Sequence, residues 1–416
     1  MPEDDVVTHM PPESSSGDPI PASPSRRTAG RTLATAALVL AAFSLRPAIT
    51  SLGPLLEEVR HGLGMSGTVA GLLTSAPALC FALFGTGAPW LARRVGPVAV
   101  VCGAMAAIAL GLALRPLAGG TAVFLAVSAL ALAGIGMSNV LMPVVVKRYF
   151  PDRVGPVTGL YSMSLTLGSA LSAGVTVPLT DALGGSWRLG LGAWALPAAL
   201  AVLPWLALAR ERGAALPAPP AQTAGQAPAV RITRSRTAWA LAVFFGLQAT
   251  AAYIAMGWMP QIFRDSGVSA GTAGLLTAVS MGIGIPLSFA LPAAAGRMRH
   301  QSSLVVVLGV FGLVGYGGLW LAPAAAPWGW AFLLGVSMST FPLALTLIGM
   351  RSRTSTGVVR LSAFAQSTGY LISIPGPILV GTLYQHTGGW GLPIGFMTAL
   401  LVPQVAAGVL AGRDRC

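Results

Sequence analysis

An arginine in the middle of a long apolar stretch is the residue of this chain best suited to binding chemistry. Arg46 lies about 22 Å of helix beyond Arg31 and about 16 Å before Glu57, at 1.5 Å per residue. At such depth in a bilayer a charge costs at least about 2.5 kcal/mol, and the side chain cannot reach either surface. We therefore expect its guanidinium to face a polar cavity, where its planar donors suit two-point binding of a carboxylate or similar anion. The alternative is that it bonds the carbonyls of a neighbouring broken helix.

A proline follows this arginine directly. Pro47 has no N–H and disfavours helical dihedrals at Arg46, so we predict a kink in the first helix at mid-membrane. Broken helices of this kind expose backbone groups at binding sites within membranes. Other polar side chains at comparable depth are candidates for substrate binding, although hydrogen bonds between helices explain each of them equally well. They are Thr50, Asn139, Tyr161, Gln248, Gln366 and Tyr370.

The other reactive residue types limit the possible chemistry. The acids lie in the N-terminal 30 residues or near the ends of apolar stretches, and the four histidines lie in the tail or in loops. The middle of the apolar stretches therefore contains no acid or histidine that could act as a base for a nucleophile, so we expect no enzyme. A proton relay would have to use Glu57, Glu58 or Asp181. The three cysteines are widely spaced, so we expect no metal site, no disulfide framework and no cofactor.

The composition defines the solvent in which these residues act. Of the 416 residues, 54% are hydrophobic and only 9% are charged, whereas soluble domains carry about a quarter charged residues. A cytosolic enzyme and a disordered protein are therefore excluded, and most of the chain must lie in lipid. The net charge of +13 comes from basic residues in short groups between apolar runs. That pattern favours orientation in a membrane over binding to nucleic acid.

Twelve apolar stretches are each long enough to cross about 30 Å of hydrocarbon as a helix. We predict an all-α membrane protein, because the alternating strands of a membrane barrel are absent. The predicted helices cover 32–54, 66–90, 97–115, 121–145, 156–180, 188–209, 237–262, 269–292, 303–321, 327–350, 361–384 and 390–411.

The chain divides into two halves of six predicted helices. Residues 64–74 and 267–277 share the motif Ala-Gly-Leu-Leu-Thr, and Trp187 and Trp390 recur at the same offset, which indicates a parallel repeat. We expect a disordered tail over 1–30, a bundle over 31–210, a linker over 211–236 and a second bundle over 237–416. Most Lys and Arg residues then lie on the side of the tail and linker. Both termini are therefore expected in the cytoplasm, and the protein in the cell (inner) membrane.

Two halves of six helices joined by a basic loop resemble the major facilitator superfamily, over about residues 31–412. A signature of that superfamily follows its second helix, where this chain reads Pro89-Trp-Leu-Ala-Arg-Arg-Val-Gly96. The basic and glycine positions, Arg93, Arg94 and Gly96, form the corresponding loop motif. Arg93 stands where the signature is acidic, so the charge-relay role of that loop does not carry over.

Several longer segments resemble one branch of that superfamily, the cyanate permeases and 2-nitroimidazole exporters. The segments are Leu45-Arg-Pro-Ala-Ile-Thr-Ser-Leu-Gly-Pro-Leu55, Gly71-Leu-Leu-Thr-Ser-Ala-Pro77, Thr158-Gly-Leu-Tyr-Ser162, Phe245-Gly-Leu-Gln248 and Trp258-Met-Pro260. The resemblance implies twelve transmembrane helices in two six-helix bundles, and transport of a small anionic or heteroaromatic compound. The expected partners are that small molecule and the lipid bilayer, with no nucleic acid.

The resulting hypothesis is a monomeric permease that moves its substrate by alternating access. Secondary active and facilitative transport both fit, and coupling to protons stays open. Two alternatives remain. One is multidrug-type efflux of neutral or acidic compounds, and the other is a membrane sensor that binds a ligand without moving it.

Overall fold

The computed structural model describes residues 24–211, 232–351 and 355–413, and within them it contains helices and no strands. The first bundle comprises α1 (Pro24–Ser44), α2 (Pro47–Thr50), η1 (Gly53–Leu55), α3 (Leu56–Leu63), α4 (Gly67–Val95), α5 (Pro97–Leu114), η2 (Arg115–Leu117), α6 (Thr121–Tyr149), η3 (Pro151–Arg153), α7 (Val154–Ala182), α8 (Trp187–Gly192) and α9 (Ala195–Glu211). The second comprises η4 (Ile232–Arg234), α10 (Arg236–Asp265), α11 (Ala270–Gly282), α12 (Gly284–Arg297), α13 (Ser302–Leu321), α14 (Pro327–Met338), α15 (Thr340–Met350), α16 (Ser355–Ser373), α17 (Pro375–Thr387) and α18 (Gly391–Gly412).

The predicted crossings are present, but four of them are divided into two helices: 188–209 into α8 and α9, 269–292 into α11 and α12, 327–350 into α14 and α15, and 361–384 into α16 and α17. Eleven helical segments within the described residues are long and apolar enough to span a membrane. The remaining predicted helix, over 361–384, is the pair α16 and α17, interrupted at Ile374 just before Pro375. This pair carries more Ser, Thr and Gln than the others, because it lines the space between the bundles. Counted with it, each bundle has six crossings.

The two repeated segments begin equivalent helices. Residues 64–74 lead into α4, and residues 267–277 lead into α11, the second crossing of each bundle. In both, a serine caps the helix: the hydroxyl of Ser66 accepts from the N–H of Val69, and that of Ser269 accepts from the N–H of Thr272. The repeat therefore reflects a shared way of starting this helix.

The ends of the predicted domains differ from their expected positions. Residues 1–23 and 212–231, most of the predicted tail and linker, lie outside the described residues. The first helix already begins at Pro24, before residue 31, because proline suits the first turn of a helix and the arginines that follow are good helix formers.

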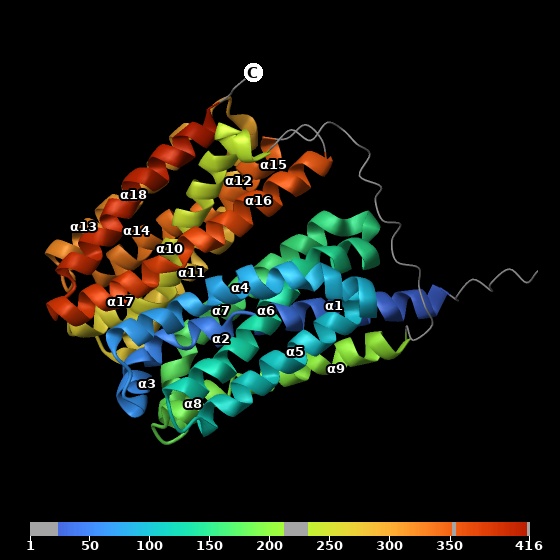
Figure 1. Cartoon of the computed structure of the whole chain (residues 1–416), viewed down its shortest axis with the longest axis horizontal. Coiled ribbons are helices and arrows are strands. Elements are labelled where there is room, and N and C mark those ends of the chain that lie inside the picture. Colours follow the sequence, from blue (N-terminus) through green and yellow to red (C-terminus); the bar gives the residue numbers. More distant parts are fainter. Residues whose placement is uncertain (1–23, 212–231, 352–354, 414–416) are drawn as a thin grey trace, which may run out of the picture.

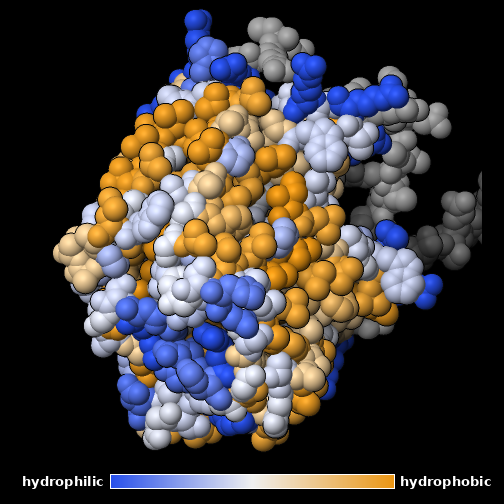
Figure 2. Space-filling model, turned by 60° about the vertical axis from the view of Figure 1, so that its left-hand side comes forward, coloured by the Kyte–Doolittle hydropathy of each residue, from blue (hydrophilic) through white to orange (hydrophobic). Residues whose placement is uncertain are grey.

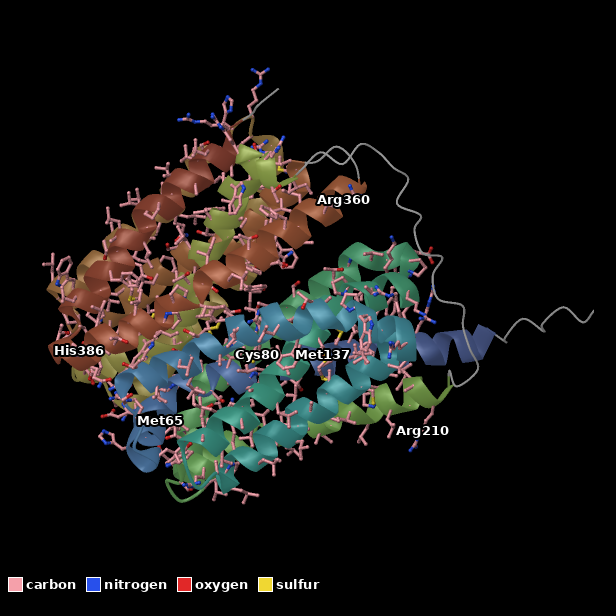
Figure 3. The ribbon with its side chains drawn as sticks, in the orientation of Figure 1. Met65, Cys80, Met137, Arg210, Arg360 and His386 are labelled. Atoms are coloured by element: carbon pink, nitrogen blue, oxygen red, sulfur yellow. The ribbon has the colours of Figure 1, made fainter. Side chains whose placement is uncertain are left out.

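The bundles lie side by side and are closest at one end (Figure 1). We name that end, which carries α3, the α3 end. The opposite end carries the start of α1 and the C-terminus, and we name it the terminal end. Met65 and His386 lie toward the α3 end, and Arg210 and Arg360 toward the terminal end (Figure 3). Figure 2 shows a broad apolar surface with hydrophilic side chains gathered toward its ends, as a membrane-spanning protein requires.

Candidate functional site

The first helix is interrupted at Arg46. Helix α1 ends at Ser44, and α2 is a single turn that starts at Pro47, whose missing N–H cannot continue the α1 ladder. The Arg46 side chain is partly exposed although it lies midway along the crossing. Among the described residues its guanidinium has no hydrogen-bond or ion-pair partner. A cation without a partner at this depth is free to bind an anion.

Tyrosines from both bundles surround this cation. The charge of Arg46 acts on the phenol groups of Tyr161 in α7, Tyr253 in α10 and Tyr370 in α16. Tyr161 belongs to the first bundle, and the other two belong to the second. Arg46 therefore faces the interface between the bundles, where a bound ligand would touch both.

Aromatic rings extend the site from these tyrosines. The ring of Phe81 in α4 meets Tyr253 edge-on at 6.5 Å and Tyr370 at 5.9 Å between centroids. On the far side of Tyr370, Phe245 lies at 5.3 Å, also edge-on. Of these rings only Tyr370 is partly exposed, so Phe81, Tyr253 and Phe245 form the buried support of one aromatic surface within reach of a positive charge. It suits a small planar anion better than a large flexible one.

Three of the predicted polar residues lie at this interface. The hydroxyl of Tyr161 donates to Oδ1 of Asn139 at 3.4 Å, which links α7 to α6. Gln366 and Tyr370 are both partly exposed on α16, and the Gln366 amide donates to the Ser362 hydroxyl at 2.6 Å. Asn139, Tyr161 and Tyr370 thus accompany Arg46 as candidates for contact with a ligand. The fourth residue, Gln366, has its amide bound within its own helix.

Two other predicted residues have their polar groups engaged elsewhere. Gln248 is 2% exposed, its amide donates to the carbonyl of Met338 at 2.8 Å, and its oxygen accepts from Gln404 at 3.1 Å. Thr50 is buried, and its hydroxyl bonds both Ser172 in α7 and the carbonyl of Arg46. Both residues hold helices together inside one bundle, as interhelical hydrogen bonds do.

The loop motif lies far from this site. Arg93 and Arg94 are exposed in the last turn of α4, and Arg94 lies over the ring of Trp90, 4.1 Å from its centroid. Gly96 ends the helix with a φ of 89°, a conformation that favours glycine. The motif thus forms the turn from α4 to α5 at the terminal end.

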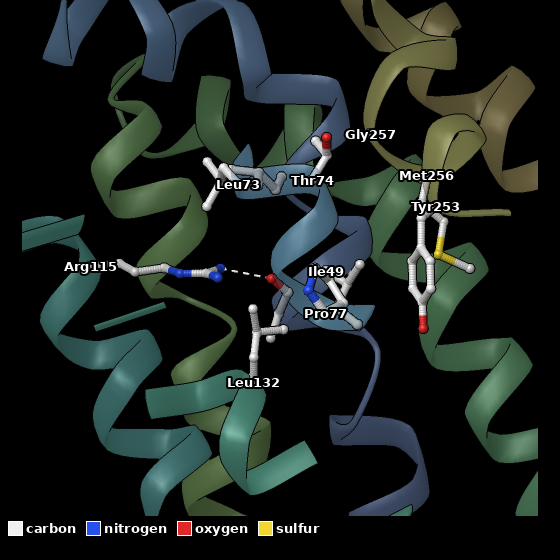
Figure 4. A pocket seen from close by; sticks show the side chains of 11 residues that line it. Ile49, Leu73, Thr74, Pro77, Arg115, Leu132, Tyr253, Met256 and Gly257 are labelled. Carbon is white, nitrogen blue, oxygen red and sulfur yellow. Dashed lines mark hydrogen bonds between the residues drawn. The ribbon is translucent and has the colours of Figure 1, made fainter. Parts of the chain in front are cut away.

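A second arginine holds the interrupted helix. Arg115 is the last residue of the predicted helix over 97–115, where a surface position is usual, but it is only 1% exposed. Its Nη1 donates to the carbonyl of Ala48 at 2.9 Å (Figure 4). Its Nε donates to the hydroxyl of Ser128 at 3.0 Å. In a continuous helix the N–H of Leu52 would bond Ala48, but here it bonds Ile49 instead. Arg115 satisfies the carbonyl that the interruption leaves free.

A small enclosed space adjoins this arginine. A cavity of about 10 Å³ lies between the bundles, close to the volume of one water molecule, and Thr74, Arg115 and Tyr253 are the polar residues that line it (Figure 4). The cavity is too small for a ligand other than water.

We expect Arg115→Met to lower the thermal stability of the purified chain. The carbonyl of Ala48 and the hydroxyl of Ser128 would lose their partners in a buried place, at about 1–3 kcal/mol for each group left unpaired. The measurement is the midpoint of thermal unfolding in detergent, with the exposed Arg153→Met as control. Equal midpoints for the two variants would show that Arg115 does not support the interrupted helix.

The fold and the site together define a multi-pass membrane transporter, since two bundles of apolar helices enclose polar groups at their interface. Residues 38–377 match the family model of the Major Facilitator Superfamily, and the chain belongs to that superfamily. The fold predicted from the sequence is thereby confirmed. Members of this superfamily are transporters and not enzymes.

Relatives support the predicted branch. The chain is 32% identical to the 2-nitroimidazole transporter of Escherichia coli (strain K12), over 92% of this chain and 96% of that protein. It is 32% identical to the cyanate transport protein CynX of the same strain, over 85% and 90%. It is 35% identical to the uncharacterized transporter YycB of Bacillus subtilis (strain 168), over 91% and 93%.

A solved structure shares the fold. It is a bacterial homologue of the human lysosomal transporter Spinster in an inward-facing and occupied conformation. The TM-score is 0.70 at 16% identity, over 94% of this chain and 93% of that one.

Proposed function

We propose that this protein moves a small planar anion across the membrane by alternating access, with Arg46 as the anchor of the negative charge. One observation carries the proposal: Arg46 is a partly exposed cation without a partner in the described chain, placed between the bundles. A guanidinium binds carboxylate and similar planar groups with two parallel hydrogen bonds.

The aromatic surroundings support the planar part of the proposal. The partly exposed ring of Tyr370 feels the charge of Arg46, and the buried ring of Phe81 packs edge-on against it, so a flat ligand would lie against Tyr370 while its charge meets the guanidinium. The names of the relatives agree, because cyanate is a small anion and 2-nitroimidazole is a small planar ring. Tyr161 and Asn139 from the first bundle would contact the same ligand.

Contacts from both bundles support alternating access. A ligand held by Arg46 and Tyr161 on one side and by Tyr253 and Tyr370 on the other couples the two halves. We place the halves at residues 31–210 and 237–416, as the sequence repeat indicates. Rocking of these halves would expose the site to each side of the membrane in turn.

The charge distribution supports an orientation. Arg93, Arg94 and Lys147 are exposed at the terminal end, together with most other basic residues of the described chain. Because cytoplasmic segments carry an excess of Lys and Arg, we place the terminal end and both termini in the cytoplasm of a cell with the protein in its inner membrane. The bundles pack closely at the α3 end, so this arrangement is the inward-facing one.

Counterflow in proteoliposomes tests the proposal. Vesicles carrying the full chain are loaded with unlabelled benzoate, and the uptake of labelled benzoate is measured. We expect uptake above that of protein-free vesicles, competition by cyanate and by 2-nitroimidazole, and no competition by tetraphenylphosphonium. Competition by large apolar neutral or acidic compounds, but not by cyanate, would favour multidrug-type efflux, and binding without any counterflow would favour a sensor.

A further inference from the structure

A cavity of about 380 Å³ lies between the start of α10 and the end of α18. The residues that line it belong to η4, to the first two turns of α10 and to the last turn of α18, and they are Arg234, Arg236, Thr237, Trp239, Ala240 and Leu410. The end of α18 lies at the terminal end of the molecule (Figure 1). None of these residues belongs to the Arg46 site, so the cavity is a separate feature of the chain.

The cavity carries positive charge that no acid of its bundle compensates. The side chains of Arg234 and Arg236 are exposed, and neither forms an ion pair within the described residues. Between residues 232 and 413 the sequence contains a single acid, Asp265. It stands at the other end of α10, about 43 Å of helix away from Arg236. The charge of the cavity therefore favours an anionic ligand.

Local hydrogen bonds hold the two arginines beside the cavity. The hydroxyl of Ser235, which lies between them, caps α10 by accepting from the N–H of Ala238 at 3.3 Å. The indole of Trp239 donates to the carbonyl of Thr233 at 2.8 Å, which fixes η4 against the first turn of α10. The Trp239 ring also meets Phe364 of α16 edge-on, at 5.3 Å between centroids. The segment that carries the arginines is thus bound to α10 and braced against α16.

Deeper in the membrane the cavity gives way to apolar surface. An added Cβ at Gly408 would lie 2.5 Å from the ring of Phe244, so α18 and α10 close together one turn beyond Ala240. On the outer face of α18, Val402 and Leu410 are 72% and 45% exposed, and their spacing of eight residues places them on one side of the helix. The cavity is therefore basic toward water and continues into an apolar track toward the hydrocarbon.

Trp239 shows the depth at which the cavity lies. Its side chain is 45% exposed in the first turn of a membrane-spanning helix that begins at Arg236. Tryptophan at such a position is typical of the interface where lipid headgroups lie. A ligand that reaches the cavity from the bilayer would bring its phosphate to Arg234 and Arg236 and lay its acyl chains along α18.

We propose that this cavity binds the headgroup of one anionic phospholipid. The two arginines donate charge-assisted hydrogen bonds to the lipid phosphate. Basic cavities between membrane helices at this level suit anionic headgroups. A soluble phosphate compound would leave the apolar track unused, so the lipid is the occupant that the surface fits. The proposal is independent of the compound transported, because the lining residues lie outside the Arg46 site.

Native mass spectrometry of the full chain tests this proposal. The detergent-purified chain is mixed with dioleoyl phosphatidylglycerol or dioleoyl phosphatidylcholine, and the fraction that carries one lipid is measured against lipid concentration. We expect the anionic lipid to bind about tenfold or more tightly than the zwitterionic one, because two arginines act on its net charge. Arg234→Gln combined with Arg236→Gln should remove this preference. Leu410→Glu keeps both arginines but adds a negative charge to the cavity, and it should weaken binding of the anionic lipid.

Each variant has a matched control. Arg297→Gln combined with Arg299→Gln removes two exposed arginines of the same bundle that lie outside the cavity, and Leu392→Glu adds an acid to an exposed position at the other end of α18. Both controls should bind the anionic lipid as the wild type does, and a single peak in size-exclusion chromatography shows that each variant is folded.

Three results would overturn the proposal. The first is equal binding of the two lipids by the wild type. The second is an equal loss of preference in the cavity variants and in their controls, which would show that only the general charge of the protein acts. The third probe is glycerol 1-phosphate, which carries the phosphate without acyl chains. Binding of this compound as tightly as the anionic lipid would show a site for soluble phosphates instead.

Discussion

Arg46→Gln is expected to weaken binding of a small carboxylate by about a hundredfold or more, since charge-assisted hydrogen bonds contribute about 1.5–3 kcal/mol each. Glutamine keeps a planar donor but loses the charge and the two-point geometry. The guanidinium has no partner in the described chain, so its loss leaves no protein group unpaired. We therefore expect binding to fall while the midpoint of thermal unfolding without ligand stays within a few degrees of the wild type.

The measurement is benzoate binding by calorimetry to the detergent-purified chain. Arg46→Lys separates charge from geometry, because a lysine offers a point charge and should recover only part of the affinity. Arg299→Gln removes an exposed arginine at the terminal end and is the control. Undiminished affinity in Arg46→Gln would show that another group anchors the anion.

Gly71→Leu is expected to have the largest effect on conformation. Its Cβ would meet backbone atoms of Pro377 and Ile378 at 2.7 and 2.8 Å, and backbone cannot move aside as a flexible side chain can. Helices α4 and α17 must therefore separate at the α3 end. Cysteines introduced at Thr68 in α4 and Thr382 in α17, whose hydroxyl oxygens lie 3.2 Å apart, measure this separation by the rate at which they form a disulfide under a mild oxidant in a chain without its native cysteines. We expect this cross-linking to slow by about tenfold or more, and counterflow to cease, because a difference of about 1.4 kcal/mol already changes a population tenfold.

Gly87→Leu is the matched control for this change. Gly87 lies in the same helix, and nothing lies within 4 Å of the position its Cβ would take. Leucine there should leave both the cross-linking rate and counterflow close to those of the wild type. If both leucine variants behave alike, the effect arises from the loss of glycine in α4 and not from contact with α17.

Hydropathy predicted the membrane-spanning helices well, because lipid allows few other structures. The repeat at 64–74 and 267–277 predicted two comparable bundles, and both segments begin equivalent helices. The exceptions are α8 with α9, α11 with α12, α14 with α15 and α16 with α17, because each of these pairs was predicted as one helix. Pro375 alone does not reveal an interruption, since prolines such as Pro77 and Pro143 lie inside continuous helices.

The site was less predictable, because spacing along one helix does not show which neighbour it faces. Gln248 and Tyr253 lie in the same helix, yet the amide is turned into its own bundle while the phenol meets the charge of Arg46. Phe81 is an apolar residue within an apolar stretch, so the sequence did not mark it as a residue of the site. Arg115 stands at the end of an apolar run, where a surface position is usual, and only the free carbonyl of Ala48 explains its burial.

The helix interruptions are distributed unequally, and this has a mechanical consequence. In the first bundle the first crossing is divided at Arg46 and the last at Ala193, between α8 and α9, but its helices α4, α6 and α7 are each 29 residues long without a break. In the second bundle three crossings are divided, at Ile283, Ser339 and Ile374. A divided helix bends at its joint more easily than a continuous one. We expect the first bundle to rotate largely as a rigid body. The second bundle is expected to bend at these joints each time the protein changes between its inward-facing and outward-facing conformations.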